Sequence, residues 1–302
     1  MISMSALFNK YVLRRVLCPI CNSLSLLMFE HLDISKKKVE LFKCVNCGHG
    51  FYPNTFSEQS IKAIYENDYA TEYLDDSVPH SLRKIQYKED VSTLIALLEK
   101  SSINVNGNLS IIDIGCSSGE YLESMPKFWS KFGFEVNPAI IQILKNKKNE
   151  FIFYDNLETV SEKFDIITMR GVIEHLTDYE VLLRFFANNL KKDGFLFISA
   201  TPDFNSPCAV IYKENWSQVV APEHINQFTA ASLQILLAKA NLVLKSLIYP
   251  YFEGPYQNWD LDKKLFLTNL GKQTKCVSKE ELRHPFPGNM MTALFQKVIF
   301  EN

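Results

Sequence analysis

The sequence predicts an α/β protein in which an open, mostly parallel sheet follows a small cysteine-rich module. From residue 109 to residue 200, short apolar runs alternate with amphipathic stretches. This alternation is typical of strand–helix–strand units that build a parallel sheet. In addition, four cysteines fall in two closely spaced pairs before residue 50. The chain therefore divides into a cysteine-rich amino-terminal part and a larger α/β part.

The composition supports a folded protein and argues against binding to nucleic acid. The 302 residues include 32 basic and 34 acidic side chains, and 47% of them are hydrophobic. This apolar content is enough for a sizeable core. A formal charge of −2 lacks the basic excess that a nucleic-acid partner requires.

The targeting signals favour a cytoplasmic protein. No run of about 18 apolar residues predicts a transmembrane segment. Lys10, Arg14 and Arg15 follow the apolar part of the amino terminus, which is the reverse of their order in a secretory signal. The alternative is a weak association of this short segment with a membrane surface.

The paired cysteines predict a structural metal site. Cys18 and Cys21 form one Cys-x-x-Cys turn, and Cys44 and Cys47 form a second. Four thiolates complete a tetrahedral site that suits Zn²⁺, and they leave no open position for catalysis. The alternative is four unrelated buried thiols.

The stretch between the cysteine pairs is expected to form a hairpin. Apolar residues over 24–29 and 39–42 flank a polar turn, so that residues 1–55 are predicted to be a zinc ribbon. His31 and His49 are rival ligands, although His49 is expected at the surface.

Residues 56–105 are predicted to be a helical linker. Tyr65, Tyr69 and Tyr73 recur on one helical face, and residues 82–100 read as an amphipathic helix. The three tyrosines form either a packing stripe or an aromatic wall over a ligand.

A glycine turn indicates a ligand site at the carboxyl-terminal end of a strand in the predicted sheet. The strand 109–114 is followed by a turn with glycines at positions 115 and 119, and a helix opens at Glu120. Such a turn brings the backbone close to a ligand at a helix amino terminus. The spacing G-x-x-x-G departs from the dinucleotide pattern G-x-G-x-x-G.

Polar residues follow each later strand as well. Glu135 ends a second strand over 132–136, where an acidic side chain can accept hydrogen bonds from ribose hydroxyls. Further strands are expected over 151–153, 164–169 and 195–200, with a helix over 178–190. Open α/β sheets bind ligands at these carboxyl ends.

Taken together, these motifs resemble those of class I S-adenosylmethionine-dependent methyltransferases over roughly residues 100–300. DIGCSSG resembles the first motif of that family, with Ser117 in place of its middle glycine, and FEVNP resembles the second. The resemblance implies a Rossmann-like, seven-stranded, mostly parallel sheet with an antiparallel last strand, in a domain over 106–302. It also implies S-adenosylmethionine as the cofactor and a methyltransferase activity of the EC 2.1.1 class.

The resemblance assigns the cofactor contacts to nine residues. The glycines let the backbone approach the methionine part, Glu135 holds the ribose, and one of two residues after the third strand meets the adenine. The assigned residues are Asp113, Gly115, Cys116, Ser117, Gly119, Glu135, Asp155, Asn156 and Arg170. Alternatively, Asp113 only forms the turn and Glu135 is a solvated strand end.

The zinc ribbon and two segments after residue 200 narrow the class of acceptor that the resemblance implies. TPDFNSP and NWSQVVAPEHINQF resemble segments of bacterial methyltransferases that act on sugars and natural products, including sugar C-methyltransferases. The resemblance implies a small-molecule or glycan-precursor acceptor, as in glycan biosynthesis. Asp203 replaces the usual asparagine of this group. The alternatives are a quinone or natural-product O-methyltransferase, a zinc-ribbon RNA methyltransferase, and a scaffold without activity.

Two histidines are candidates for the general base that an oxygen or carbon acceptor requires. His224 is expected to be the base, on a loop over the acceptor, and His175 faces the cofactor site. Each histidine is alternatively a structural residue. Gly171 replaces the first glutamate of the E-x-x-E-H run that binds a divalent ion in quinone O-methyltransferases, so this second metal site is expected to be absent.

The expected acceptor contacts complete the set of site residues. They are Tyr65, Tyr69, Tyr73, Trp216 and Glu223. The insertion 250–288 is long enough to be a lid or a binding loop. The last strand, over 292–300, is expected at an edge of the sheet.

Overall fold

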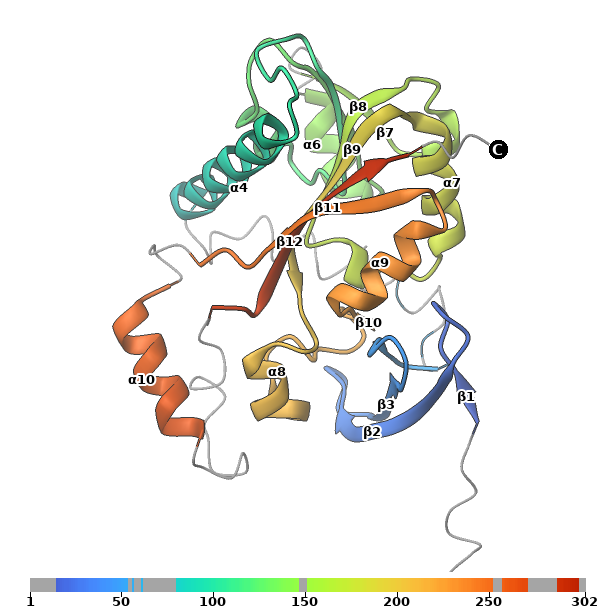
Figure 1. The fold of residues 1–302 in the computed structure, drawn as a ribbon, viewed down its shortest axis with the longest axis vertical. Helices are drawn as coiled ribbons and strands as arrows, with labels where there is room; N and C mark the ends of the chain where they lie inside the picture. Colours follow the sequence, from blue (N-terminus) through green and yellow to red (C-terminus); the bar gives the residue numbers. More distant parts are fainter. Residues whose placement is uncertain are drawn as a thin grey trace, which may run out of the picture.

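The structure is a computed structural model that describes residues 15–53, 56, 61, 80–146, 151–251, 257–270 and 287–298. It contains a seven-stranded sheet with helices on both faces and a five-stranded sheet near the amino terminus (Figure 1). Among the described residues, no helix is both long enough and apolar enough to cross a membrane.

The larger sheet has the strand order β11-β12-β9-β8-β5-β6-β7. Its strands are β5 (Ser110–Ile114), β6 (Ser130–Phe134), β7 (Ile152–Tyr154), β8 (Phe164–Arg170), β9 (Leu190–Pro202), β11 (Leu242–Ile248) and β12 (Met290–Lys297). Strands β5 to β9 pair in parallel, and β12 is antiparallel to both β9 and β11. This order confirms the predicted Rossmann-like sheet of seven strands.

The expectation that the last strand lies at an edge of the sheet is wrong. Strand β12 is inserted between β9 and β11, and β11 takes the edge. Burial explains the order. Five consecutive residues of β12 are buried, whereas most of β11 is only partly buried or exposed. A continuously apolar strand is stable where it has neighbours on both sides.

Helices cover both faces of the sheet. On one face, Leu94 and Leu98 of α4 (His80–Lys100) pack with Phe197. On the other face, α7 (Tyr179–Asn189) and α9 (Ala230–Ala238) pack against β8, β9 and β12. Smaller helices, α5 (Glu120–Glu123), α6 (Pro138–Asn146) and α8 (Pro207–Tyr212), fill the remaining connections. Helix α9 begins at a capping box formed by Thr229 and Ser232, which explains its amino-terminal end.

The smaller sheet contains the predicted hairpin and one strand from a distant part of the chain. Its strands are β1 (Val16–Leu17), β2 (Leu24–Leu32), β3 (Lys38–Cys44), β4 (Gly50–Phe51) and β10 (Asn226–Gln227), in this order. Strands β2 and β3 form the hairpin, and β10 pairs antiparallel with β4. The ribbon therefore shares its sheet with the α/β part of the chain.

Side-chain contacts strengthen this connection. The Thr229 hydroxyl donates a hydrogen bond of 2.7 Å to the carbonyl of Cys47. Phe42 and Cys47 of the ribbon belong to the same hydrophobic core as Phe228 and Leu237. In Figure 1 the blue amino-terminal strands lie next to α8 and α9. The ribbon is thus packed against the α/β part over a continuous apolar interface.

His49 is buried, and the expectation that it lies at the surface is wrong. Its ring is fully shielded from solvent and stacks on Phe51, with Phe228 at 4.9 Å between ring centroids. Burial lowers the pKa of His49 to about 3. The reason for the error is that the pairing of β4 with β10 shields His49 from solvent. No local sequence pattern predicts this pairing.

The insertion before the last strand contains one described helix, α10 (Trp259–Leu270). The Tyr251 hydroxyl donates a hydrogen bond of 2.6 Å to the buried Asp262 carboxylate and so anchors the helix. The role of this insertion as a lid stays a prediction.

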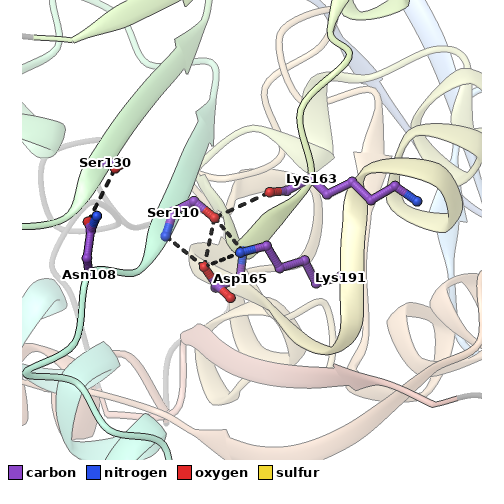
Figure 2. A network of polar contacts seen from close by, with 6 residues as sticks. All are labelled: Asn108, Ser110, Ser130, Lys163, Asp165 and Lys191. Atoms are coloured by element: carbon purple, nitrogen blue, oxygen red, sulfur yellow. Dashed lines mark hydrogen bonds and ion pairs between the residues drawn. The ribbon is translucent and has the colours of Figure 1, made fainter.

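A polar network fixes the amino-terminal ends of three neighbouring strands (Figure 2). The backbone amide and the hydroxyl of Ser110 donate to Asp165 at 2.8 and 2.7 Å, and the Lys191 ammonium lies 2.8 Å from the same carboxylate. Burial raises the pKa of Asp165, but the hydrogen bonds from Lys191 and Ser110 outweigh it and leave that pKa below its usual value.

Replacing Asp165 with Asn should destabilise the protein by about 1–3 kcal/mol, because three donors lose a charged acceptor. Urea unfolding at pH 7 measures this loss. The control is Asp178→Asn at the amino terminus of α7, where the side chain accepts from Glu180 and Asn caps as well as Asp. Equal stability of the two variants would contradict a role for the network.

Candidate active site

A cavity of about 240 Å³ lies at the carboxyl ends of the parallel strands. We call it the cofactor cavity. Its lining includes six residues from the predicted motifs or the loop that follows β8, namely Gly115, Ser117, Glu135, Arg170, Gly171 and His175. The cavity lies where open α/β sheets bind ligands, and it brings together the first, second and fourth strand ends that the sequence singled out.

The turn requires glycine at its first and last positions. Gly115 has φ +74° and Gly119 has φ +84°, both in the left-handed region. A Cβ atom on Gly115 would lie 2.7 Å from Val172, and one on Gly119 would lie 2.2 Å from Phe151. The turn therefore presents bare backbone at the start of α5, as a bound ligand would need.

Glu135 anchors this turn to the next strand. Its Oε2 accepts from the Ser117 amide at 3.0 Å, and its Oε1 accepts from the amides of Val136 and Asn137 at 2.7 and 2.9 Å. A carboxylate has about four lone-pair sites, so the Glu135 side chain retains acceptor capacity at the cavity wall.

Asp113, Cys116 and Gly119 are not among the residues that line the cofactor cavity. Asp113 is buried, and the Thr168 hydroxyl donates to it at 2.7 Å. Burial raises the pKa of Asp113 to about 7. Cys116 packs against Gly133, where its sulfur would contact an added Cβ at 2.7 Å. This placement fits the alternative in which Asp113 forms the turn.

Asp155 and Asn156 are exposed after β7 and are not among the residues that line the cavity. The Asn156 side chain instead accepts from the Glu158 amide at 2.9 Å and caps the short helix η1 (Leu157–Thr159). The structure therefore does not bring either residue to the cofactor cavity, and their contact with adenine stays a prediction.

Arg170 is held by a helix that sequence reasoning did not connect to the site. Its Nε donates to Asp90 at 2.7 Å and its Nη2 donates to Gln86 at 3.3 Å, while the guanidinium lies 5.0 Å from the centre of the Tyr87 ring. These three residues belong to α4, about 80 positions earlier. The only signal in the sequence for this contact was the Asp90 carboxylate next to the apolar residues of an amphipathic helix.

Glu174, which is buried, and the half-buried His175 and His224 form a compact group beside the cavity. The two imidazole rings meet edge to face at 4.7 Å between centroids. His175 Nδ1 lies 2.9 Å from the Glu223 carbonyl, and His224 Nδ1 lies 3.0 Å from the Gln218 carbonyl. The sequence named both histidines, but the fold is what brings them together.

Burial sets the protonation of this group. It lowers the pKa of His175 to about 3 and that of His224 to about 4, and it raises the pKa of Glu174 to about 8. All three side chains are therefore neutral near pH 7. Their ligand atoms lie within 4.8 Å of one another, so they could also hold a divalent ion although Gly171 replaces a glutamate.

The neutral histidines predict sensitivity to acid. Because the unfolded chain protonates these histidines near pH 6.5 and the folded chain does not, the stability that they contribute falls as the pH drops from 6.5 toward 4, whereas the raised pKa of Glu174 acts in the opposite direction. Each histidine contributes about 1.4 kcal/mol per pH unit in this window. His224→Gln should reduce the slope of unfolding free energy against pH, measured by urea titration. Equal slopes for the variant and the parent would show that His224 is charged in the folded state.

The predicted acceptor contacts fall in different places. Trp216 is buried and lines another cavity, next to the ribbon hairpin. Glu223 supplies the carbonyl that His175 contacts. Tyr65, Tyr69 and Tyr73 lie outside the described residues.

The four paired cysteines converge on one point. Sulfur–sulfur distances are 3.6 Å for Cys18–Cys47, 3.5 Å for Cys21–Cys44 and 3.6 Å for Cys21–Cys47. A tetrahedral site with Zn–S bonds of about 2.3 Å has sulfur–sulfur edges of about 3.8 Å. The amides of Asn46 and Cys47 also approach the Cys44 sulfur at 3.4 and 3.5 Å. The thiols are thus arranged to hold a metal ion of this size.

The fold and the cavity define a class I S-adenosylmethionine-dependent methyltransferase. The chain belongs to the methyltransferase domain family, whose model matches residues 80–247. That match includes α4, which supplies the partners of Arg170. The chain therefore contains a methyltransferase domain of this family.

Curated relatives share part of this domain. The ubiquinone biosynthesis O-methyltransferase of Bartonella tribocorum is 31% identical over 101 residues, which cover 30% of this chain and 41% of that protein. The enzyme of the same name from Bradyrhizobium diazoefficiens is 31% identical over 110 residues, with coverage of 32% and 42%. The chain thus spans about two fifths of the length of these relatives.

Solved structures share the fold. One chain of the complex between the Haloferax volcanii Trm112 methyltransferase activator and a methyltransferase aligns with a TM-score of 0.52 at 13% identity, over 79% of this chain and 98% of that one. The magnesium protoporphyrin IX methyltransferase of Synechocystis, with bound SAH, aligns with a TM-score of 0.50 at 11% identity, over 80% and 100%. At these identities the likeness concerns the fold alone.

Proposed function

We propose that the protein methylates an oxygen or carbon atom of a small-molecule acceptor, with a sugar or glycan precursor as the first acceptor class. The observation that carries the proposal is the neutral pair His175 and His224 beside the cofactor cavity. A methylated oxygen or carbon atom must lose a proton, and these imidazoles can accept it. The two relatives named above support a phenolic or quinone-like acceptor as the second class.

The cofactor would be held by the residues around the glycine turn. Gly115 presents its backbone at the cavity, Glu135 offers carboxylate oxygens for hydroxyl groups, and Arg170 adds a positive charge. A Cβ atom on Gly115 would collide with Val172 of the cavity wall, and one on Gly119 would collide with Phe151 behind the turn. When bound, S-adenosylmethionine supplies an activated methyl group. Asp113 and Cys116 would support the turn from the protein interior.

His224 would be the proton acceptor. With Nδ1 donating to the Gln218 carbonyl, the ring presents Nε2 as its basic atom. Burial lowers its pKa to about 4 and keeps the ring neutral at physiological pH. The Nε2 lone pair is then free, but the ring is a weaker base than an exposed histidine. His175 would orient this ring through their edge-to-face contact.

The cysteine cluster would hold a structural Zn²⁺ ion. The thiols Cys18, Cys21, Cys44 and Cys47 offer four ligands, and all lie within 4.8 Å of one another. A filled tetrahedral set stabilises the ribbon and leaves no position for substrate.

The test combines an acceptor screen with a single variant. Methyl transfer from labelled S-adenosylmethionine is measured for glycan precursors, phenols and ribosomal RNA. For the acceptor that is methylated, His224→Ala should reduce kcat by about 10²–10⁴-fold, while the Kd for S-adenosylhomocysteine changes less than twofold. His31→Ala, on the ribbon hairpin, is the control.

Three results would contradict the proposal. Near-normal turnover of His224→Ala would remove its role as base. Turnover that requires added Mg²⁺ would assign Glu174 and the histidines to a metal site instead. Methylation of RNA alone would replace the proposed acceptor class.

A further inference from the structure

A second cavity adjoins the cofactor cavity, and the ribbon forms one of its walls. This ribbon cavity measures about 530 Å³ and lies between the amino-terminal sheet and the α/β part. Leu176 and Thr177 line both cavities. The two cavities are therefore neighbours that share these two residues as part of their walls.

Most of the residues that line this cavity are aromatic or aliphatic, and polar side-chain and backbone atoms are exposed between them. The ribbon side presents Leu17, Phe51 and Tyr52, and Phe56 meets Tyr52 edge to face at 5.6 Å. Ile225 contributes from the α/β side. Aromatic walls of this kind favour flat rings or hydrocarbon groups.

The charge of the lining is positive. Among the described residues of the ribbon cavity, Arg15 carries the single formal charge, and none is a carboxylate. Asn226 adds a polar group, and its Nδ2 is fixed by donating to the Leu176 carbonyl at 2.7 Å. An anionic group would therefore find one cation and no opposing charge.

The wall is held rigidly against the catalytic part. Strand β4, which carries Phe51, pairs with β10, and Tyr52 follows directly. The hydrogen bond from Thr229 to Cys47 fixes the adjacent knuckle. A preformed wall binds a ligand without an additional ordering cost.

We propose that the ribbon cavity binds the non-reacting part of the acceptor, and that this part is an anion with an aromatic or hydrocarbon ring system. The ribbon is then a selectivity element of the enzyme as well as a metal-stabilised module. This inference rests on the proposed small-molecule acceptor.

Two related dyes test the cavity directly. Fluorescence titration compares 8-anilino-1-naphthalenesulfonate, which is anionic, with its uncharged analogue N-phenyl-1-naphthylamine. The anionic dye should bind the full-length protein more tightly. Arg15→Glu should raise its Kd about fivefold or more and leave the Kd of the uncharged dye unchanged. Lys37→Glu, an exposed charge reversal on the hairpin, is the matched control.

A second pair of variants separates the cavity from the outer ribbon surface. Leu17 lines the cavity and is 55% exposed, whereas Leu27 lies on β2 outside it and is 47% exposed. Leu17→Asp should weaken binding of both dyes about tenfold, and Leu27→Asp should have little effect. Circular dichroism confirms that the variants are folded.

Equal affinity for the two dyes, or equal losses in Leu17→Asp and Leu27→Asp, would overturn the inference. Titration with S-adenosylhomocysteine is run on the same samples. If the parent protein did not bind it, the proposed function would fail, and the dye titrations would still decide whether the ribbon cavity takes an anion.

Discussion

Replacing Gly119 with Ala is expected to abolish cofactor binding. The added Cβ atom would lie 2.2 Å from Cζ of Phe151, and Phe151 is packed among Leu122, Ile140 and Leu144. A left-handed Ala costs about 1–2 kcal/mol, and overpacking adds about 1–3 kcal/mol. Because the strain falls on the turn itself, the Kd for S-adenosylhomocysteine should rise more than 100-fold in calorimetric titration.

Gly171→Ala is the matched control for this prediction. Gly171 lines the cofactor cavity and likewise has a positive φ, +59°, but its added Cβ atom would meet its nearest neighbours only at 3.8 Å. The control should therefore lose about 1–2 kcal/mol of stability and retain measurable cofactor binding. If Gly119→Ala bound the cofactor as well as Gly171→Ala, the glycine turn would not be the binding element.

Replacing Cys44 with Ser should have the largest effect on stability. Cys44 is buried and belongs to the core that the ribbon shares with α7 and α9. Loss of one ligand removes the binding energy of the metal from the folded state. We expect a loss of more than about 4 kcal/mol in the free energy of unfolding, measured by urea denaturation of zinc-loaded protein.

The metal content provides the second measurement. Mass spectrometry of the purified parent protein should find one zinc per chain, and the Cys44→Ser variant should contain almost none. Cys208→Ala is the control, since Cys208 is a buried residue of α8, away from the four-cysteine cluster. A parent protein that contained no zinc, or a Cys44→Ser variant with unchanged stability, would contradict the structural role of the cluster.

Local patterns were enough to predict the sheet and the turn. A glycine turn between an apolar strand and a helix has few alternative folds, so Gly115, Gly119 and Glu135 could be located from spacing alone. The two Cys-x-x-Cys turns could also be predicted from local sequence, because four consecutive residues define each of them. The edge position of β11 could not be predicted in this way. It depends on which of the two last strands, β11 or β12, is buried on both faces.

Long-range contacts could not be predicted from these patterns. Asp90 reaches Arg170 from a helix 80 residues away, and the burial of His49 depends on a strand that comes about 175 residues later. The Asn156 side chain is taken up by a local cap of the short helix η1. In each case a partner distant in sequence, or a competing hydrogen bond, decides the position.

The antiparallel pairing of β4 with β10 has a consequence for how this enzyme can change over evolutionary time. A module attached by a tether can be exchanged between proteins, whereas this ribbon contributes strands to a sheet that the catalytic chain completes. Insertions or deletions in the loop before β10 would shift its register against β4 and thereby move the wall of the ribbon cavity. Ribbon and catalytic domain must therefore be inherited together, and a change in acceptor preference can arise from length variation in either partner.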